Sequence, residues 1–149
     1  MTMRLTLHSD YSLRVLIFLT LKRGQQATIP EIAQAYQISR GHLMKVVHEL
    51  GKLGYVATLR GRGGGLTLGK PAGSIRIGDV LRKTEDSLAL VECFTKPEPG
   101  AGCRIEGACR LKGVLAEAQR AFFDTLDKYT LADLVDGRAA PLKRQLRLA

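Results

Sequence analysis

The sequence lacks three features, and each absence excludes a class of protein. It has no run of 18 or more apolar residues, which excludes a transmembrane helix. Residues 1–24 lack a basic leader and a small-residue cleavage site, so we expect no secretory signal, no membrane partner and a cytoplasmic location. No histidine follows His48, and no nucleophile is paired with a base in a readable motif, so we expect no enzymatic activity.

Cysteine is also scarce, and its distribution is uneven. The three cysteines are Cys93, Cys103 and Cys109, all within residues 93–109. An odd number of cysteines in a short cytosolic chain argues against a disulfide framework. Their clustering instead suggests sulfur atoms that serve one centre.

Acidic residues are few: 14 stand against 23 lysines and arginines, for a net charge of +9. Residues 1–80 hold 11 basic and 4 acidic residues, whereas residues 81–149 hold 12 and 10. The positive charge therefore belongs mainly to the first half, which indicates a polyanionic partner for that half.

Three helices are predicted in the first half. Ser9 and Asp10 suit the start of the first, and Gly24 ends it. Thr28 and Glu31 form a capping box for a short second helix to about residue 36. Residues 37–38 make a turn, and Ser39 caps a third helix that runs to about residue 52.

Two short helices joined by a tight turn predict a helix-turn-helix. The second helix of such a motif enters the major groove of double-stranded DNA. Arginine and lysine can reach guanine O6 and N7, and serine can serve bases or phosphates. The candidate DNA contacts here are Thr28, Ser39, Arg40, His42 and Lys45. The alternative is a helical hairpin whose charges are only solvated.

The segment that follows favours DNA binding. Two short strands, residues 55–59 and 66–68, flank the glycine-rich basic segment 60–65, which is typical of a winged helix. Arg60 and Arg62 can enter a minor groove, and glycines such as Gly64 permit close backbone approach. A nucleotide-phosphate loop would need a helix after the glycines, and here a strand follows.

The cysteine segment admits three interpretations. Soft thiolates favour zinc, Cu(I) or an iron–sulfur cluster. Zinc ligands usually come in close cysteine pairs, which are absent here, whereas a cluster tolerates wider spacing. A cluster with one non-cysteine ligand, a zinc site and a thiol redox switch all remain open.

A long helix is predicted over residues 108–129. Its apolar stripe exceeds what a small core can cover, so we expect a symmetric partner helix; the alternative is a core helix of its own domain. Thr130 starts a short last helix to residue 135, and the basic tail after Asp136 is a candidate for disorder. The stripe consists of Leu111, Val114, Leu115, Ala118, Ala121, Phe122 and Leu126.

The predicted fold is mainly α with a small β-hairpin wing. It comprises a winged helix-turn-helix domain (1–80) and a connecting helix with a cysteine-bearing cluster loop (81–107). A dimerisation helix with a short last helix (108–136) and a basic tail (137–149) complete it.

Several segments resemble the Rrf2 family of bacterial winged-helix regulators, which carry iron–sulfur clusters. The resemblance lies in residues 5–6, 10–11 and 13–14, in the wing segment 60–66, and in three cysteines before a long helix. Within that family the chain is most similar to nitric-oxide-sensing repressors, through segments 68–72, 75–80, 109–112 and 129–135.

The resemblance implies a homodimeric transcriptional repressor that binds palindromic DNA and responds to nitric oxide; iron- and redox-responsive relatives share much of the pattern. It implies a cluster, 4Fe–4S rather than 2Fe–2S, held by Cys93, Cys103, Cys109 and by Asp10 of the other subunit. The alternative role of Asp10 is a cap in the first helical turn. The nine residues between Cys93 and Cys103 form a longer interval than the family usually has.

Overall fold

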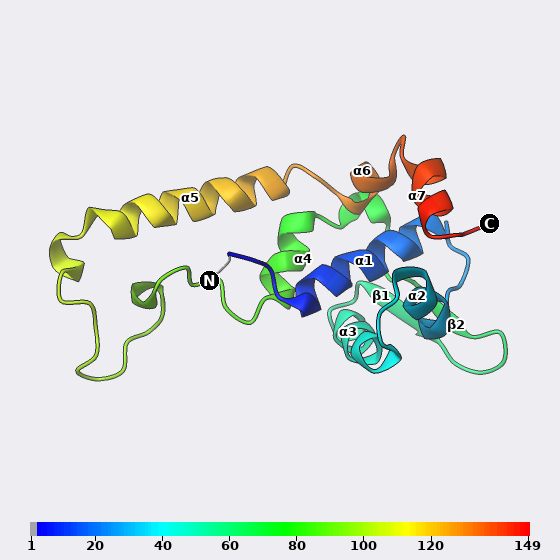
Figure 1. Ribbon diagram of the computed structural model, residues 1–149, viewed down its shortest axis with the longest axis horizontal. Helices are drawn as coiled ribbons and strands as arrows, with labels where there is room; N and C mark the ends of the chain where they lie inside the picture. Colours follow the sequence, from blue (N-terminus) through cyan, green and yellow to red (C-terminus); the bar gives the residue numbers. More distant parts are fainter. Residues whose placement is uncertain (1–2) are drawn as a thin grey trace.

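The first half of the chain folds as three helices followed by a β-hairpin (Figure 1). The computed structural model describes residues 3–149. The helices are α1 (Leu7–Leu21), α2 (Ile29–Tyr36) and α3 (Arg40–Lys52). The strands are β1 (Val56–Leu59) and β2 (Gly65–Leu68), and they pair antiparallel.

Helix α1 begins earlier than the sequence pattern predicts. Thr6, rather than Ser9, is the N-cap, and its hydroxyl oxygen accepts a hydrogen bond from the Ser9 backbone N–H at 3.2 Å. Ser9 is instead a fully buried helical residue whose Oγ lies 2.8 Å from Thr84 Oγ1. The prediction of a start at Ser9 is therefore wrong, because its hydroxyl bonds Thr84 of α4 and the Thr6 hydroxyl, while Thr6 caps the helix.

The capping box at Thr28 and the turn after α2 are confirmed. The Thr28 N–H donates to Glu31 Oε2 at 2.7 Å, and Thr28 Oγ1 accepts from the Glu31 N–H at 3.3 Å. Gln37 then adopts a left-handed conformation, with φ of 56°, and ends α2. Ser39 caps α3 by accepting from the His42 N–H at 3.2 Å.

The wing hairpin is tied to the helix-turn-helix by backbone hydrogen bonds. Its register pairs Val56 with Leu68 and Leu59 with Gly65. Ala27, next to the cap of α2, donates to the Leu66 carbonyl at 2.9 Å and accepts from the Leu66 N–H at 2.6 Å. Ala27 therefore pairs with β2 through an antiparallel β-bridge, in addition to the pairing of β2 with β1.

The core of this half is built from the inward faces of the three helices and the hairpin. Burial of each large side chain stabilises the fold by about 1.5–3 kcal/mol. Residues of α4 (Ile77–Thr84) and α6 (Leu131–Val135) join the same core. Its fully buried members include Val15, Leu16, Phe18, Ile32, Leu43, Val46, Leu50, Val80 and Leu131. We call residues 3–84 together with α6 and α7 (Ala139–Gln145) the head.

Helix α4 spans residue 80, where the sequence suggested a domain boundary, so the head continues to Thr84. A short 3-10 turn η1 (Ala72–Ser74) precedes it. Two more, η2 (Glu92–Phe94) and η3 (Glu106–Ala108), interrupt the loop that leads to α5 (Arg110–Leu126). We call residues 85–126 the arm.

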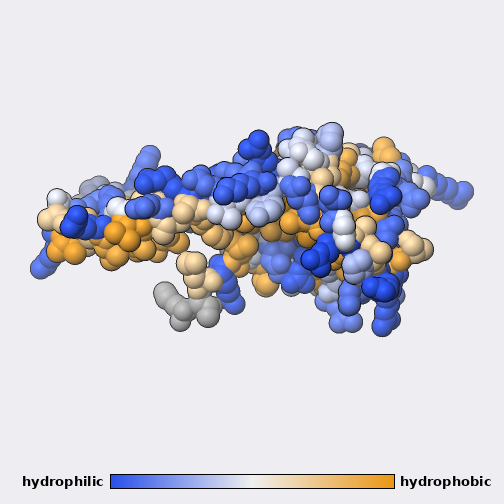
Figure 2. All heavy atoms as spheres, turned by 90° about the horizontal axis from the view of Figure 1, so that it is seen from above, coloured by the Kyte–Doolittle hydropathy of each residue, from blue (hydrophilic) through white to orange (hydrophobic). Residues whose placement is uncertain are grey.

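Helix α5 extends away from the head instead of packing along it (Figure 1). Phe123 is its one buried residue, whereas Leu111, Val114 and Phe122 are 59%, 57% and 44% exposed. Hydrophobic surface follows the arm in Figure 2. The interpretation of α5 as a core helix of its own domain is wrong.

The base of α5 is anchored to α4. Arg82 donates through both terminal nitrogens to the Asp127 carboxylate at 2.8 Å and lies over the Phe123 ring, 4.5 Å from its centroid. The Arg82 hydrogen bonds lower the pKa of Asp127. Gly78 makes room for this contact, because a Cβ there would lie 1.9 Å from Asp127 Oδ1.

The basic tail is helical, so the expectation of disorder is wrong. Helix α7 follows α6, and Leu146 and Leu148 pack against the core of the head. Among residues 3–149, no helix is both long enough and apolar enough to cross a membrane.

Candidate DNA-reading face and cysteine loop

The predicted contacts on α3 form an exposed face. Arg40 and Lys45 are exposed, and within residues 3–149 neither makes an ion pair. Ser39 and Thr28 are also exposed, although each hydroxyl oxygen already accepts a backbone N–H as a helix cap. Each hydroxyl proton remains free to donate to a phosphate.

His42 differs from its predicted neighbours because it is half-buried. Its ring meets Tyr11 of α1 edge-on, with centroids 4.6 Å apart. Its place on α3 therefore makes it a contact between the first helix and the candidate recognition helix, as well as a candidate DNA contact.

Met44 lies on the same face and was missed in the sequence analysis. Its side chain is 59% exposed, beside Lys45. Positions 40, 41, 44, 45 and 48 alternate with the buried positions 43, 46, 47 and 50 at helical spacing, and this signal identifies it. A thioether at such a position offers apolar contact to a thymine methyl group.

The wing brings Arg60 and Arg62 to an exposed tip, and neither makes an ion pair among the described residues. Gly61 and Gly63 have φ of 94° and 73°, which favours glycine. Gly64 is needed for a different reason, because a Cβ there would lie 2.3 Å from the Leu59 carbonyl oxygen. Glycine at residue 64 thus allows the two sides of the hairpin to approach closely at the tip.

Asp10 sits in α1, where both carboxylate oxygens accept from Arg14 at 3.1 and 2.8 Å. The Arg14 guanidinium also lies 5.5 Å from the Tyr11 ring centroid and 5.9 Å from that of Tyr36. Burial raises the pKa of Tyr36 to about 12. A continuous set of contacts therefore runs from Asp10 through Arg14 and Tyr11 to His42 on α3.

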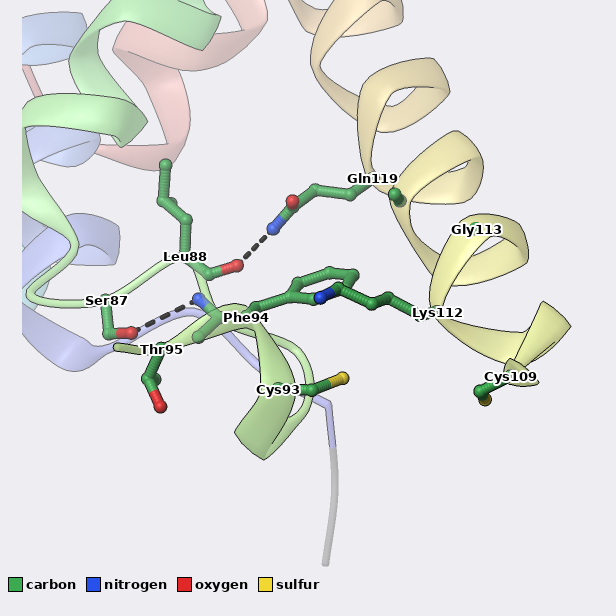
Figure 3. Close-up of a pocket in the computed structure, with 11 residues that line it drawn as sticks. Ser87, Leu88, Cys93, Phe94, Thr95, Cys109, Lys112, Gly113 and Gln119 are labelled. Carbon is green, nitrogen blue, oxygen red and sulfur yellow. Dashed lines mark hydrogen bonds between the residues drawn. The ribbon is translucent and has the colours of Figure 1, made fainter. Parts of the chain in front are cut away.

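The structure brings two of the three cysteines together. Cys93 and Cys109 line an open groove of about 920 Å³ between the loop and α5 (Figure 3). Cys103 is exposed and does not line it. Within the described part of the chain, no three His, Cys, Asp or Glu side chains gather as a metal site.

Two contacts hold the loop against α5. Gln119 donates to the Leu88 carbonyl, as Figure 3 shows. Lys112 donates to Glu106 and lines the cysteine groove. The hydrogen bond to Glu106 raises the pKa of Lys112, and the nearby sulfurs of Cys93 and Cys109 raise it further.

The donor set fits a thiolate-bound metal centre by its chemistry. All three cysteines are free thiols, and Lys112 supplies positive charge beside two of them. Asp10 lies on α1 of the head and does not join the cysteines within one chain. A site with Asp10 as a ligand therefore needs a second copy of the chain.

A family model settles the family. Residues 5–137 match the Rrf2 model, described as an iron-dependent transcriptional regulator. The chain belongs to the Rrf2 family. Rrf2 proteins named HTH-type transcriptional regulator NsrR are similar over nearly the whole length. That of Bacillus subtilis is 52% identical over 142 residues, which cover 95% of this chain and 96% of that protein. That of Geobacillus kaustophilus is 50% identical, with 93% of each chain covered.

Solved Rrf2-type structures share the fold. CymR of B. subtilis, titled the global cysteine regulator, superposes with a TM-score of 0.70 at 28% identity, covering 91% of this chain and 98% of CymR. A protein from Listeria innocua superposes with a TM-score of 0.76 at 26% identity, covering 93% of this chain and 90% of that protein. This Rrf2 protein is accordingly a transcriptional regulator and not an enzyme, with the predicted winged-helix fold.

Proposed function

We propose that this Rrf2 protein is a homodimeric repressor that binds palindromic double-stranded DNA and senses nitric oxide through an iron–sulfur cluster. The exposed, unpaired cations of α3 and the wing carry the DNA-binding part, because Arg40, Lys45, Arg60 and Arg62 all lack internal partners within residues 3–149. Such cations neutralise DNA phosphates or read base edges.

The uncovered stripe of α5 supports the homodimer. Leu111, Val114 and Phe122 are exposed along a 17-residue helix, and antiparallel or crossed packing against a second copy would bury them. Two recognition helices about 34 Å apart would then meet successive major grooves of a palindrome.

The three cysteines support the cluster, and the similarity to NsrR-named relatives supports its effector. Cys93, Cys103 and Cys109 would hold it, with Asp10 of the other subunit as the fourth ligand and 4Fe–4S as the favoured type. When bound, the cluster supplies iron to which nitric oxide can coordinate, most readily where a carboxylate replaces a thiolate.

The contacts of Asp10 suggest how the two functions are coupled. Arg14 holds both carboxylate oxygens in the single chain, so Arg14 and a ligand position in the other subunit compete for Asp10. If Asp10 leaves Arg14, the Arg14 guanidinium is free to move away from the Tyr11 ring. Because that ring contacts His42, the position of α3 would change with it. A shift of a few kcal/mol between two arrangements is enough to change the fraction bound to DNA.

Anaerobic purification tests the cofactor directly. We expect a brown protein with iron, sulfide and a visible absorbance that nitric oxide bleaches, together with loss of binding to a duplex selected from a random-sequence library. Colourless protein with stoichiometric zinc contradicts the proposal. Metal-free protein whose DNA binding follows peroxide and reductant also contradicts it and indicates a thiol switch.

Asp10→Ala tests the coupling, with Glu117→Ala, an exposed acidic residue of α5, as the matched control. We expect the alanine at residue 10 to destabilise the chromophore and to narrow the difference in DNA affinity between cluster-loaded and cluster-free protein. The control should change neither. Unchanged chromophore stability and an unchanged affinity difference in Asp10→Ala would show that Asp10 is not a cluster ligand and only pairs with Arg14 in α1.

A further inference from the structure

The tail of the chain forms a second positively charged surface, away from α3. Residues 137–149 contain Arg138, Lys143, Arg144 and Arg147 and no acidic residue. Leu146 and Leu148, which follow α7, pack against the core and fix this segment to the head. We call these four cations and Arg23 the C-terminal basic patch.

Residues at the end of α1 join the tail at this surface. Arg23 and Lys143 line one small hollow of about 220 Å³, together with Lys22. Lys22 is paired with Glu31 at 3.4 Å, but within residues 3–149 no patch cation makes an ion pair. Asp133 and Asp136 line a neighbouring hollow with Arg23, and within residues 3–149 neither forms an ion pair with it. Like charges held together without partners favour an anionic ligand.

The patch lies close to the wing. Arg23 is four residues before Ala27, so their Cα atoms are at most about 14 Å apart, and Ala27 is hydrogen-bonded to Leu66 of the wing. Figure 1 shows α7 and the tip of the hairpin at the same end of the long axis, opposite the free end of α5. In a dimer joined through α5, the patch would therefore lie at each outer edge, at the same end of the chain as the wing tip.

We propose that the C-terminal basic patch binds phosphates of the DNA that flanks the operator, outside the segment read by α3 and the wing. The inference rests on the DNA binding proposed above. Arg138, Arg144 and Arg147 lie just before, within and just after α7, and none makes an ion pair within residues 3–149. Such cations suit a regularly spaced polyanion and carry no means of reading base sequence. An acidic protein surface is the alternative ligand. We favour DNA because the patch lies close to the wing, which is itself a candidate DNA contact.

The test compares two duplexes that carry the same site, selected from a random-sequence library by wild-type protein. One ends at the site, and the other extends it by about 10 base pairs, one helical turn, at each end. Affinities are measured by fluorescence anisotropy over a range of salt concentrations. The variant is Arg144→Gln/Arg147→Gln, and glutamine suits residue 147, where φ is 55°, because Gln37 adopts φ of 56° in this chain.

The matched control is Arg120→Gln/Lys128→Gln, which removes the same charge from exposed positions in and just after α5. On the extended duplex, the patch variant should bind more weakly, and its slope of log affinity against log salt should be shallower by about 0.9 for each lost phosphate contact. On the short duplex, wild type, variant and control should coincide.

Equal slopes for wild type and patch variant on the extended duplex would overturn the inference, as would an equal loss on both duplexes or in the control. Altered transcription in a purified system with unchanged DNA binding would also overturn it and assign the patch to an acidic protein. If selection enriches no duplex at all, the proposed DNA-binding function itself fails, and this outcome is separate from the others.

Discussion

The head and the arm of this chain follow opposite rules of packing. The head buries most of its large apolar side chains, with Leu16, Phe18, Leu43 and Leu50 at 0% exposure. The arm leaves its own uncovered, with Leu111 at 59% and Val114 at 57%. The head can therefore be stable as a single chain, whereas the arm has a surface that only another molecule can cover.

The same contrast holds for chemistry. The candidate DNA contacts of the head are already in place on α3 and the wing. The arm places Cys93 and Cys109 on one groove without completing a site, because Cys103 lies outside that groove. Under the proposed function, this division places signal sensing in the arm, because the arm is the part that a cluster and a second subunit would complete.

The largest effect should come from the core of the head. Phe18→Ala removes a fully buried ring, and we expect the free energy of unfolding to fall by about 3–5 kcal/mol. Urea unfolding followed by circular dichroism measures it. The loss should not depend on protein concentration. A loss below about 1 kcal/mol, or one that varies with concentration, would show that the head is not independently packed.

Next comes the stripe of the arm. Val114→Glu places a charge on the exposed apolar face of α5, and we expect the dimer dissociation constant to rise at least about thirtyfold. Sedimentation measures the change, and circular dichroism should show unchanged helix content. Arg120→Gln, on the opposite face, is the control. Dimers that survive Val114→Glu unchanged would place the interface elsewhere.

The smallest effect belongs to the junction of the two regions. Because the hydrogen bonds from Arg82 lower the pKa of Asp127 in the folded chain, this pair stabilises the fold above the ordinary carboxyl value of 3.8. That stabilisation is lost as the pH falls through the lowered folded-state pKa. Arg82→Gln should therefore be less stable than wild type at neutral pH, and the difference should shrink in acid. Urea unfolding across the acid range measures it, and a difference constant with pH would contradict this account.

Most of the head could be predicted from the sequence because its signals are local. The Thr28–Glu31 capping box and the glycine-rich hairpin each specify a backbone geometry within a few residues. The start of α1 could not be assigned locally, because Thr6 and Ser9 are both good caps and a contact with Thr84 decides between them. Helix α7 was missed for the same reason, since Leu146 and Leu148 pack against residues far away in the sequence.

The candidate site was predictable to different degrees. Exposed cations on α3 and the wing follow from helical and strand periodicity, and closer attention to that periodicity would have included Met44. The arrangement of the cysteines does not follow from spacing, because residues 94–102 adopt mostly irregular structure. A ligand set that spans two subunits, as proposed for Asp10 and the cysteines, would leave no spacing pattern within one sequence.

The two hydrogen bonds between Ala27 and Leu66 have a mechanical consequence. They join the residue before the α2 cap to β2 of the wing, whereas Ser39 caps α3 at the other end of α2. Backbone hydrogen bonds therefore attach the wing to the start of α2, whereas α3 meets α1 through a side-chain contact, that of His42 with Tyr11. Under the proposed function, a signal that lowers DNA affinity would therefore act on the position of α3 against α1 and on the spacing of the two heads, while the wing stays attached to α2.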